Sequence, residues 1–193
     1  MISRIWALLK HWREAKSAFS TLSALYGNLG DMDALGGLTD EEMTGLVSWL
    51  PERGIFVEVG TLFGITAKAV KRARPGLRVI AVDNFSWNPF GLPSVAHEAF
   101  TRRILDGAGV EVVRATSSAW RNETGSIDAV FFDASHCYED VKAECEWAKA
   151  KGIQLIGGHD YKNRNPRFGV TRAVDEVFGR ENIVCTGMCW RVK

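Results

Sequence analysis

The 193-residue chain lacks a long hydrophobic run. No window approaches the ~18 apolar residues that a membrane-spanning helix needs. The apolar run near the start, Ile5 to Leu9, is too short for a secretory signal, and a charged residue follows at once. The sequence therefore predicts a protein with no transmembrane segment, and we expect it to be cytoplasmic.

The chain also lacks an excess charge of either sign and any paired C-x-x-C spacing. Its net charge is +1 and no broad basic stripe is visible, which argues against a nucleic-acid partner. Four cysteines are present, at positions without the spacing of a zinc motif, so the sequence predicts reduced core thiols. Low-complexity tracts and repeats are absent, which is typical of one globular domain.

Apolar runs alternate with helical patterns over most of the chain. Strands are expected near 54–60, 77–83, 110–116, 127–135, 153–160 and 182–193, and helices near 38–51, 64–76, 92–109, 138–152 and 169–180. Alternating strands and helices imply parallel pairing with crossovers. The predicted fold is therefore an α/β three-layer αβα sandwich.

The first 50 residues differ from the rest and are expected to form an N-terminal helical extension, with the main domain at 51–193. Residues 2–26 carry apolar side chains at a helical period, and Thr39 with Glu42 forms a capping box that begins a second helix. Two interpretations of the first helix remain open. It packs on the domain or on a second subunit, giving a homodimer, or it lies on a membrane surface; we favour packing.

Glu58, Gly60 and Gly64 follow the first predicted strand of the main domain. Ligands of open α/β sheets bind beyond the carboxyl ends of the strands, and glycines there let backbone N–H groups approach a ligand. The pattern is not the dinucleotide fingerprint, because it has no third glycine, and a carboxylate at Glu58 would repel a pyrophosphate. It favours a ligand with a cationic amino acid group. Thr61 either adds a hydroxyl contact or caps the helix.

Asp83 ends the next strand, where an acid is suited to hold both hydroxyls of a ribose. A ligand with ribose at Asp83 and an ammonium near Glu58 is S-adenosylmethionine. An NAD-dependent enzyme is a further alternative, disfavoured by the missing glycine and by Glu58.

These residues, with "IDAVFFDASHCYEDV", "LIGGHDY" and "GVTRAVDEVF", resemble the class I S-adenosylmethionine-dependent methyltransferases, in particular a bacterial branch of small O-methyltransferases. The resemblance covers about residues 54–193. It implies a Rossmann-like seven-stranded sheet whose last strand is antiparallel. It also implies a cofactor site formed by Glu58, Gly60, Gly64, Asp83, Asn84, Ser117, Ser118 and Asp133.

Asp133 and His136 follow the fourth strand, and His159 and Asp160 follow the fifth. Related metal-dependent enzymes take ligands from these two strand ends, which implies a divalent cation such as Mg²⁺ at Asp133, His159 and Asp160. The His-Asp pair departs from the usual Asp-Asp or Asp-Asn. Metal-free catalysis with His136 or His159 as general base is the rival, and His136 as a helix cap is a third interpretation.

The sequence thus predicts a methyltransferase that modifies a hydroxyl group on a sugar or another small molecule. Four cations follow Tyr161 and either bind an anionic sugar or form a solvated loop: Lys162, Arg164, Arg167 and Arg172. The second hypothesis is a nucleotide-binding module of the same fold that does not catalyse.

Overall fold

A computed structural model describes residues 37–87, 93–123 and 125–193 of the chain. The predicted amphipathic helix at 2–26 lies outside the described residues, and so does the homodimer contact assigned to it. None of the helices within the described ranges is long and apolar enough to cross a membrane.

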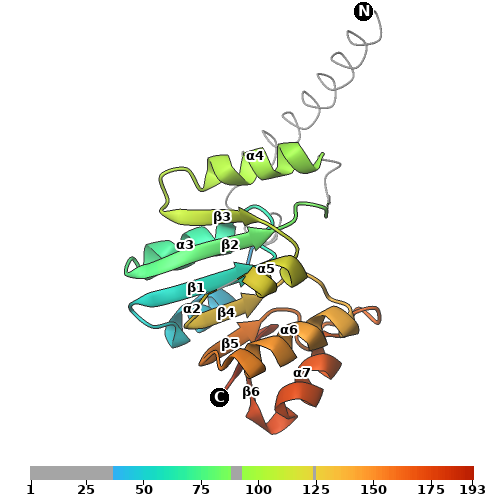
Figure 1. Ribbon diagram of the computed structural model, residues 1–193. Helices are drawn as coiled ribbons and strands as arrows, with labels where there is room; N and C mark the ends of the chain where they lie inside the picture. The colour runs from blue at the N-terminus through green and yellow to red at the C-terminus, as the bar shows by residue number, and fades with distance from the viewer. Residues whose placement is uncertain (1–36, 88–92, 124) are drawn as a thin grey trace, which may run out of the picture.

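Seven strands form one sheet in the order β3-β2-β1-β4-β5-β7-β6 (Figure 1). The pairs among β1 to β5 are parallel, whereas β7 runs antiparallel to both β5 and β6. This confirms the predicted Rossmann-like sheet with an antiparallel last strand. The strands are β1 (Gly54–Val59), β2 (Leu77–Asp83), β3 (Val110–Arg114), β4 (Ala129–Phe132), β5 (Leu155–Gly158), β6 (Ile183–Thr186) and β7 (Cys189–Val192).

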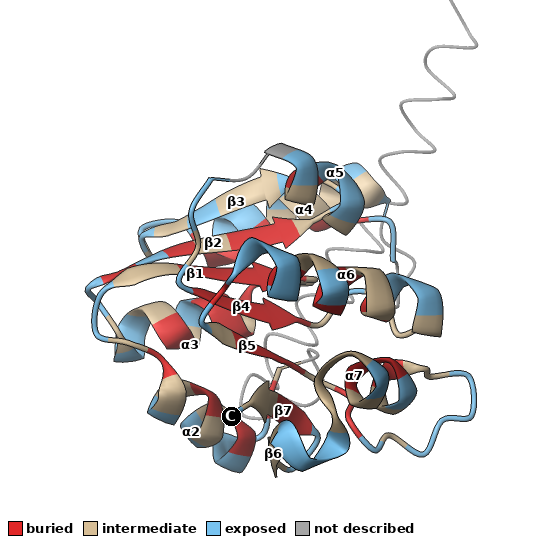
Figure 2. Cartoon of the chain, turned by 60° about the horizontal axis from the view of Figure 1, so that its bottom comes forward, coloured by how far each residue is buried: buried red, intermediate tan, exposed pale blue. Residues whose placement is uncertain are grey.

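Helices cover both faces of the sheet, as the three-layer prediction requires. Successive strand residues point to opposite faces, so Phe56 and Phe131 join one hydrophobic cluster while Val57 and Val130 join the other. The central strands are buried and the helices are buried on one side only (Figure 2). Helices α2 (Asp40–Trp49), α3 (Ile65–Ala73) and α4 (Ser94–Ile104) supply the first cluster, and α5 (Ser117–Glu123), α6 (Tyr138–Lys151) and α7 (Val170–Phe178) supply the second.

Helix α2 begins at the predicted capping box. The Thr39 side chain accepts a hydrogen bond from the Glu42 amide, and the Glu42 carboxylate accepts one from the Thr39 amide, at 3.3 and 3.1 Å. Leu46 and Leu50 are buried in the same cluster as Phe56. Helix α2 therefore packs on the sheet, and its first turn reaches the edge where β7 starts.

Among the described α-helices, α5 is the one that the sequence pattern did not predict. Its seven residues, SSAWRNE, carry a single buried apolar side chain, Trp120, so no amphipathic period is visible. Thr116 caps it, because its hydroxyl accepts a hydrogen bond from the Ala119 amide at 3.1 Å. The helix depends on Trp120 packing against Trp147 of α6, with ring centroids 5.5 Å apart.

All four cysteines are free thiols, as predicted. Cys145 and Cys189 are buried and Cys185 is half-buried. Cys137 is exposed, so the prediction of a core position is wrong for this residue, because it lies at the N-cap of α6.

Candidate functional site

Backbone strain gathers at the carboxyl edge of the sheet. Four described non-glycine residues have a positive φ: Leu62, Phe85, Asp160 and Lys162. Each follows the end of β1, β2 or β5. Such conformations cost about 1–3 kcal/mol each and persist where the surroundings hold them, often at functional sites. This edge is where the sequence places the site.

Glu58 lies near the end of β1 with only 2% of its surface exposed. The Thr61 hydroxyl donates a hydrogen bond to its carboxylate. Burial raises the pKa of Glu58 to about 8, with Asp133 and Asp83 adding to the rise and Thr61 opposing it. The carboxyl group is therefore buried together with Thr61, which is 5% exposed.

Asp83 ends β2 and joins two turns. Its Oδ2 accepts a hydrogen bond from the Leu62 amide at 2.8 Å, and its Oδ1 accepts one from the Phe85 amide at 2.7 Å. Leu62 and Phe85 are two of the residues with positive φ. Asp83 thus holds the strained turns after β1 and β2 together, a role that the sequence did not reveal. Each carboxylate oxygen still has a lone pair for a diol.

Gly60 and Gly64 are required for different reasons. A Cβ on Gly60, which has φ +95°, would lie 2.2 Å from the Asp133 carbonyl oxygen, so the turn after β1 touches the loop after β4. Gly64, with φ +77°, is the N-cap of α3, and a Cβ there would meet Leu105 at 2.6 Å. In both places the glycine allows the chain itself to pack closely.

The other predicted cofactor residues lie along the same edge. Asn84 is exposed, and its side-chain oxygen accepts a hydrogen bond from the Ser86 amide at 2.8 Å. Ser118 is exposed beside Thr116, with 3.1 Å between the hydroxyls. The Ser117 hydroxyl is buried, so a ligand would meet the backbone of this residue before its side chain. Their contacts with a cofactor stay predictions.

An acid–imidazole cluster joins the ends of β4 and β5. His136 Nε2 lies 2.7 Å from Asp160 Oδ2 and 3.8 Å from Asp133 Oδ1. His159 Nδ1 lies 3.6 Å from Asp160 Oδ2 and 3.8 Å from Asp133 Oδ1. The structure therefore brings together all four residues that the sequence selected for catalysis. His136 does not cap the following helix, whose N-cap is Cys137.

The two imidazoles are held as cations by the two carboxylates. Burial by itself would lower the pKa of His136, but hydrogen bonds with Asp133 and Asp160 outweigh it and raise the pKa to about 9. The pKa of His159 is likewise raised to about 9, because Asp160 and Asp133 outweigh burial. Burial would raise the pKa of Asp160, yet the two histidines hold it well below its usual range. Burial raises the pKa of Asp133.

The cluster fits a divalent cation by the chemistry of its donors. Asp133, His159 and Asp160 each offer one ligand atom, and these atoms lie within 4.8 Å of one another. Two carboxylate oxygens with one imidazole nitrogen suit Mn²⁺, Fe²⁺ or Zn²⁺ better than Mg²⁺, which prefers oxygen alone.

The predicted substrate loop lies next to this cluster. Phe168 stacks on His136 with ring centroids 4.2 Å apart, and the Gly169 amide donates a hydrogen bond to the His136 carbonyl at 2.7 Å. The loop after β5 thus folds back onto the loop after β4. Its three cations Lys162, Arg164 and Arg167 are exposed, and so is Arg172, which lies in α7 over the ring of Tyr138.

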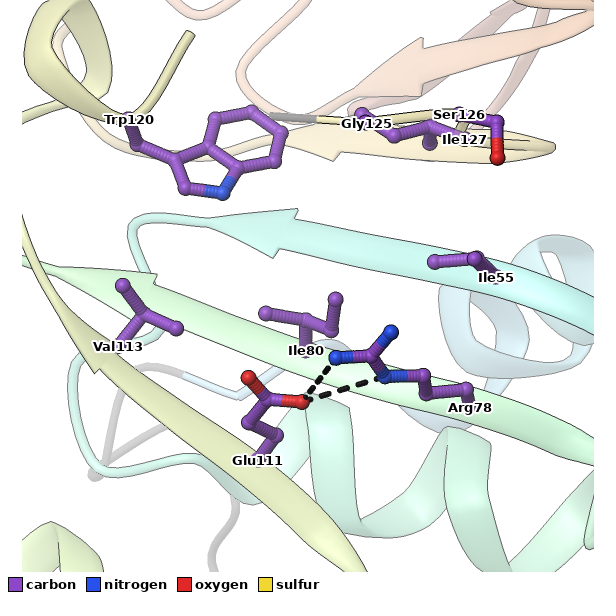
Figure 3. A pocket seen from close by; sticks show the side chains of 9 residues that line it. All are labelled: Ile55, Arg78, Ile80, Glu111, Val113, Trp120, Gly125, Ser126 and Ile127. Carbon is purple, nitrogen blue, oxygen red and sulfur yellow. Dashed lines mark hydrogen bonds and ion pairs between the residues drawn. The ribbon is translucent and has the colours of Figure 1, made fainter. Parts of the chain in front are cut away.

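A separate hollow of about 290 Å³ lies toward the amino ends of β1, β2 and β3, under Trp120 (Figure 3). Its polar contact is the ion pair between Arg78 and Glu111, at 2.7 Å, and most of the remaining lining is apolar. It contains none of the acid–imidazole cluster and lies at the opposite edge of the sheet, so we do not assign the chemistry to it.

Sequence reasoning missed three residues near the cluster. Glu42 from α2 lies 3.4 Å from His159 Nε2, Cys189 from β7 lies beside them, and Phe168 stacks on His136. Glu42 was assigned only to helix capping. Glu42 and His159 are 117 positions apart, so no local pattern could have paired them.

No protein-family model matches the chain, and no curated protein matches it. Solved structures do match. An O-methyltransferase from Bacillus cereus in complex with SAH is 17% identical, with a TM-score of 0.59 over 94% of this chain and 91% of that one. Precorrin-6y C5,15-methyltransferase from Geobacter metallireducens is 12% identical, with a TM-score of 0.55 over 78% and 84%.

A ribosomal protein L11 methylase from Lactobacillus delbrueckii is 14% identical, with a TM-score of 0.54 over 78% of this chain and 74% of that one. At these identities the likeness establishes the fold alone. The fold is thus the one that these methyltransferases share. The three similar proteins are named for different acceptors, so the fold leaves the acceptor open.

Proposed function

We propose that the protein is an S-adenosylmethionine-dependent methyltransferase that modifies a hydroxyl group on a sugar or another small molecule. The observation that carries the proposal is the contact between Gly60 and the backbone of Asp133 and Ala134. It places the predicted cofactor turn directly against the acid–imidazole cluster. A cofactor on the turn would therefore lie beside the two imidazoles and two carboxylates of the cluster.

The cofactor would supply an activated methyl group on a sulfonium. The chain's part is to bind and orient it. The Thr61 turn, backed by Glu58, faces the amino acid end, and Asp83 lies at the tip of the next strand for the ribose hydroxyls. Asn84 and the start of α5, at Ser117 and Ser118, border the position proposed for the adenine.

The acceptor hydroxyl must lose a proton as its oxygen bonds to the methyl carbon and the bond from that carbon to sulfur breaks. His136 is the group we favour as the general base, because its ring lies against the substrate loop at Phe168. Its raised pKa, about 9, means that His136 must lose its proton before it can act as the base. Asp160, 2.7 Å away, would stabilise the imidazolium that forms.

A divalent cation held by Asp133, His159 and Asp160 would orient the hydroxyl and lower its pKa. Metal-free catalysis by His136 or His159 remains the alternative. The exposed cations Lys162, Arg164, Arg167 and Arg172 favour an acceptor that carries a negative charge, such as a phosphorylated or uronic sugar.

The test combines binding with turnover on the full chain. We expect S-adenosylhomocysteine to bind and methyl transfer to occur with members of a panel of neutral and anionic sugars, assayed with EDTA, Mg²⁺ or Mn²⁺. Asp160→Asn should lose methyl transfer by at least ~100-fold while keeping S-adenosylhomocysteine affinity, since it lies in the proton-transfer cluster. Lys149→Gln, on the exposed side of α6, is the control.

Three outcomes would redirect the proposal. Binding without transfer to any acceptor would favour the non-catalytic module. NAD binding in place of S-adenosylhomocysteine would favour the NAD-dependent alternative. Full activity of Asp160→Asn would remove that residue from both the base and the cation proposals.

A further inference from the structure

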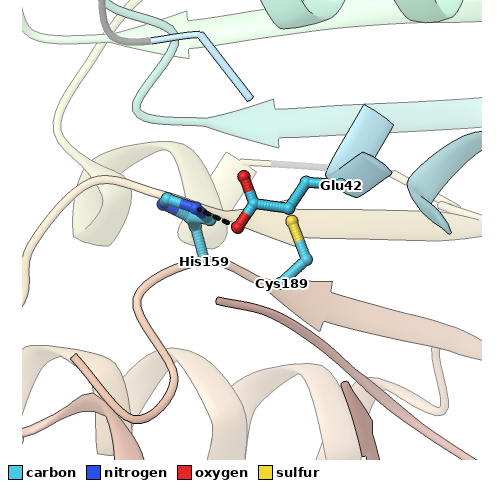
Figure 4. A group of neighbouring side chains, drawn as sticks. All are labelled: Glu42, His159 and Cys189. Atoms are coloured by element: carbon cyan, nitrogen blue, oxygen red, sulfur yellow. Dashed lines mark hydrogen bonds and ion pairs between the residues drawn. The ribbon is translucent and has the colours of Figure 1, made fainter. Parts of the chain in front are cut away.

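The far side of His159 faces a second group of metal-binding side chains (Figure 4). Its Nε2 lies 3.4 Å from Glu42 Oε1, and Cys189 Sγ completes the group, with the three ligand atoms within 4.8 Å of one another. Glu42 is 4% exposed and Cys189 is 6% exposed. The three residues come from α2, from the end of β5 and from β7.

From this geometry we propose that Glu42, His159 and Cys189 form a binding site for Zn²⁺. Carboxylate, imidazole and thiolate are the three ligand types that zinc uses in proteins, and three protein ligands leave a fourth tetrahedral position. Sulfur disfavours Mg²⁺ and Ca²⁺. This site uses Nε2 of His159, whereas the cation site proposed with Asp133 and Asp160 would use Nδ1 of the same ring, and the proposal stands whether or not the protein is a methyltransferase.

Neighbouring groups hold the ligands in place, as the hydrogen-bond partners of zinc ligands do. His159 Nδ1 faces Asp160 and Asp133, so an N–H on Nδ1 would leave the Nε2 lone pair free for Zn²⁺. In that state His159 does not ligate a cation at Asp133 and Asp160. Glu42 Oε1 accepts a hydrogen bond from the Met188 amide at 2.7 Å, and its Oε2 accepts two from Thr39. Glu42 is therefore fixed between α2 and the turn before β7.

The turn before β7 is shaped to approach Glu42. Gly187 has φ +58°, and a Cβ there would lie 2.5 Å from Glu42 Oε1. Only glycine allows the turn to come this close, and the turn places Cys189 at the start of β7. The sequence reads "GMC" here, without the paired C-x-x-C spacing that marks many zinc sites, so the motif alone could not reveal the group.

Bound zinc would hold Cys189 as a thiolate beside the buried carboxylate of Glu42. A divalent ion would compensate a buried thiolate and a buried carboxylate together. It would also tie α2 to the ends of β5 and β7.

The test is a titration of the full chain, stripped of metal with EDTA, with Co²⁺ and then Zn²⁺. We expect one Co²⁺ to bind with thiolate-to-cobalt charge-transfer absorption and Zn²⁺ to displace it. Cys189→Ser should abolish the absorption. Glu42→Gln should weaken affinity at least ~100-fold, because losing an outer-shell partner alone costs roughly 10- to 100-fold.

Two control variants separate this site from its neighbours. Cys185→Ser, on β6, should keep the absorption. Asp133→Asn removes only a partner of His159 Nδ1, so it should weaken affinity by at most roughly 10- to 100-fold and keep the absorption at saturating Co²⁺. The inference is wrong if the wild type shows no thiolate absorption, or if Cys189→Ser retains it. It is also wrong if Asp133→Asn abolishes binding while Cys189→Ser does not. Should Cys189→Ser fail to fold, unchanged affinity of Glu42→Gln would equally overturn it.

Discussion

At the scale of single residues, Asp83 is a structural brace as well as a predicted ribose ligand. Its two oxygens accept the amides of Leu62 and Phe85, so it fixes two strained turns before any ligand arrives. A side chain that orders the turns around a ligand reduces the entropy that binding must otherwise overcome.

We therefore expect Asp83→Ala to weaken S-adenosylhomocysteine binding by about 1–3 kcal/mol and to lower the free energy of unfolding by a similar amount. Calorimetry gives the first quantity and urea unfolding the second. Asp106→Ala, on an exposed loop, serves as the control for both. A folded Asp83→Ala protein with unchanged affinity would refute the ribose role.

Glu144 is a further residue with an unusual environment. It is 1% exposed on α6, and neither carboxylate oxygen accepts a hydrogen bond from the described residues. Burial raises the pKa of Glu144 to about 7. The Ser117 hydroxyl lies near but outside hydrogen-bonding geometry, and it lowers this pKa by less than burial raises it. The folded protein therefore holds this proton more tightly than the unfolded chain, whose glutamate titrates near 4.5.

Glu144 therefore makes the protein less stable as the pH rises. The contribution of Glu144 to stability is greatest below the unfolded pKa and falls as the pH rises to about 7. Glu144→Gln should remove this loss of stability at high pH. At pH 8 the variant should therefore be more stable than the wild type by up to ~3 kcal/mol, and at pH 5 by much less. Urea unfolding at both pH values measures this, with the exposed Glu146→Gln as the control. If Glu144→Gln and Glu146→Gln showed the same change in stability between pH 5 and pH 8, the raised pKa would not belong to Glu144.

At the scale of elements, the strands were predictable and α5 was not. The strands read as apolar runs because they are buried on both faces, and β2 was predicted at its observed bounds, Leu77–Asp83. Helix α2 was predictable from Thr39 and Glu42, since a capping box is a local signal. Helix α5 depends on Trp120 meeting Trp147, a tertiary contact that leaves no periodicity in the sequence.

The contact between the turn after β1 and the loop after β4 can be tested with two glycines. Gly60→Ala and Gly107→Ala both place alanine at a positive φ, which costs about 1–3 kcal/mol. Only the Cβ at Gly60 meets backbone, whereas a Cβ at Gly107 meets nothing within 4 Å. Gly60→Ala should therefore destabilise the protein by a further ~1–3 kcal/mol in urea unfolding, from overpacking. If Gly60→Ala and Gly107→Ala lost similar stability, the contact between Gly60 and the loop after β4 would be loose.

At the scale of the whole molecule, the topology assembles the site from segments that lie far apart. Parallel strands bring their carboxyl ends to one edge, which is why Asp83, Asp133 and Asp160 could be grouped from sequence. Glu42 and Cys189 reach the same edge through α2 and through the antiparallel β7. Their approach to His159 depends on packing and register, and these were not readable from the motifs.

The most direct measurement of the central claim is calorimetric titration of the full chain with S-adenosylhomocysteine, with NAD as the comparison ligand. The account predicts saturable one-to-one binding of the adenosyl compound, weakened in Asp83→Ala, and no binding of NAD. A correctly folded wild-type protein that gives no binding signal with S-adenosylhomocysteine would contradict it.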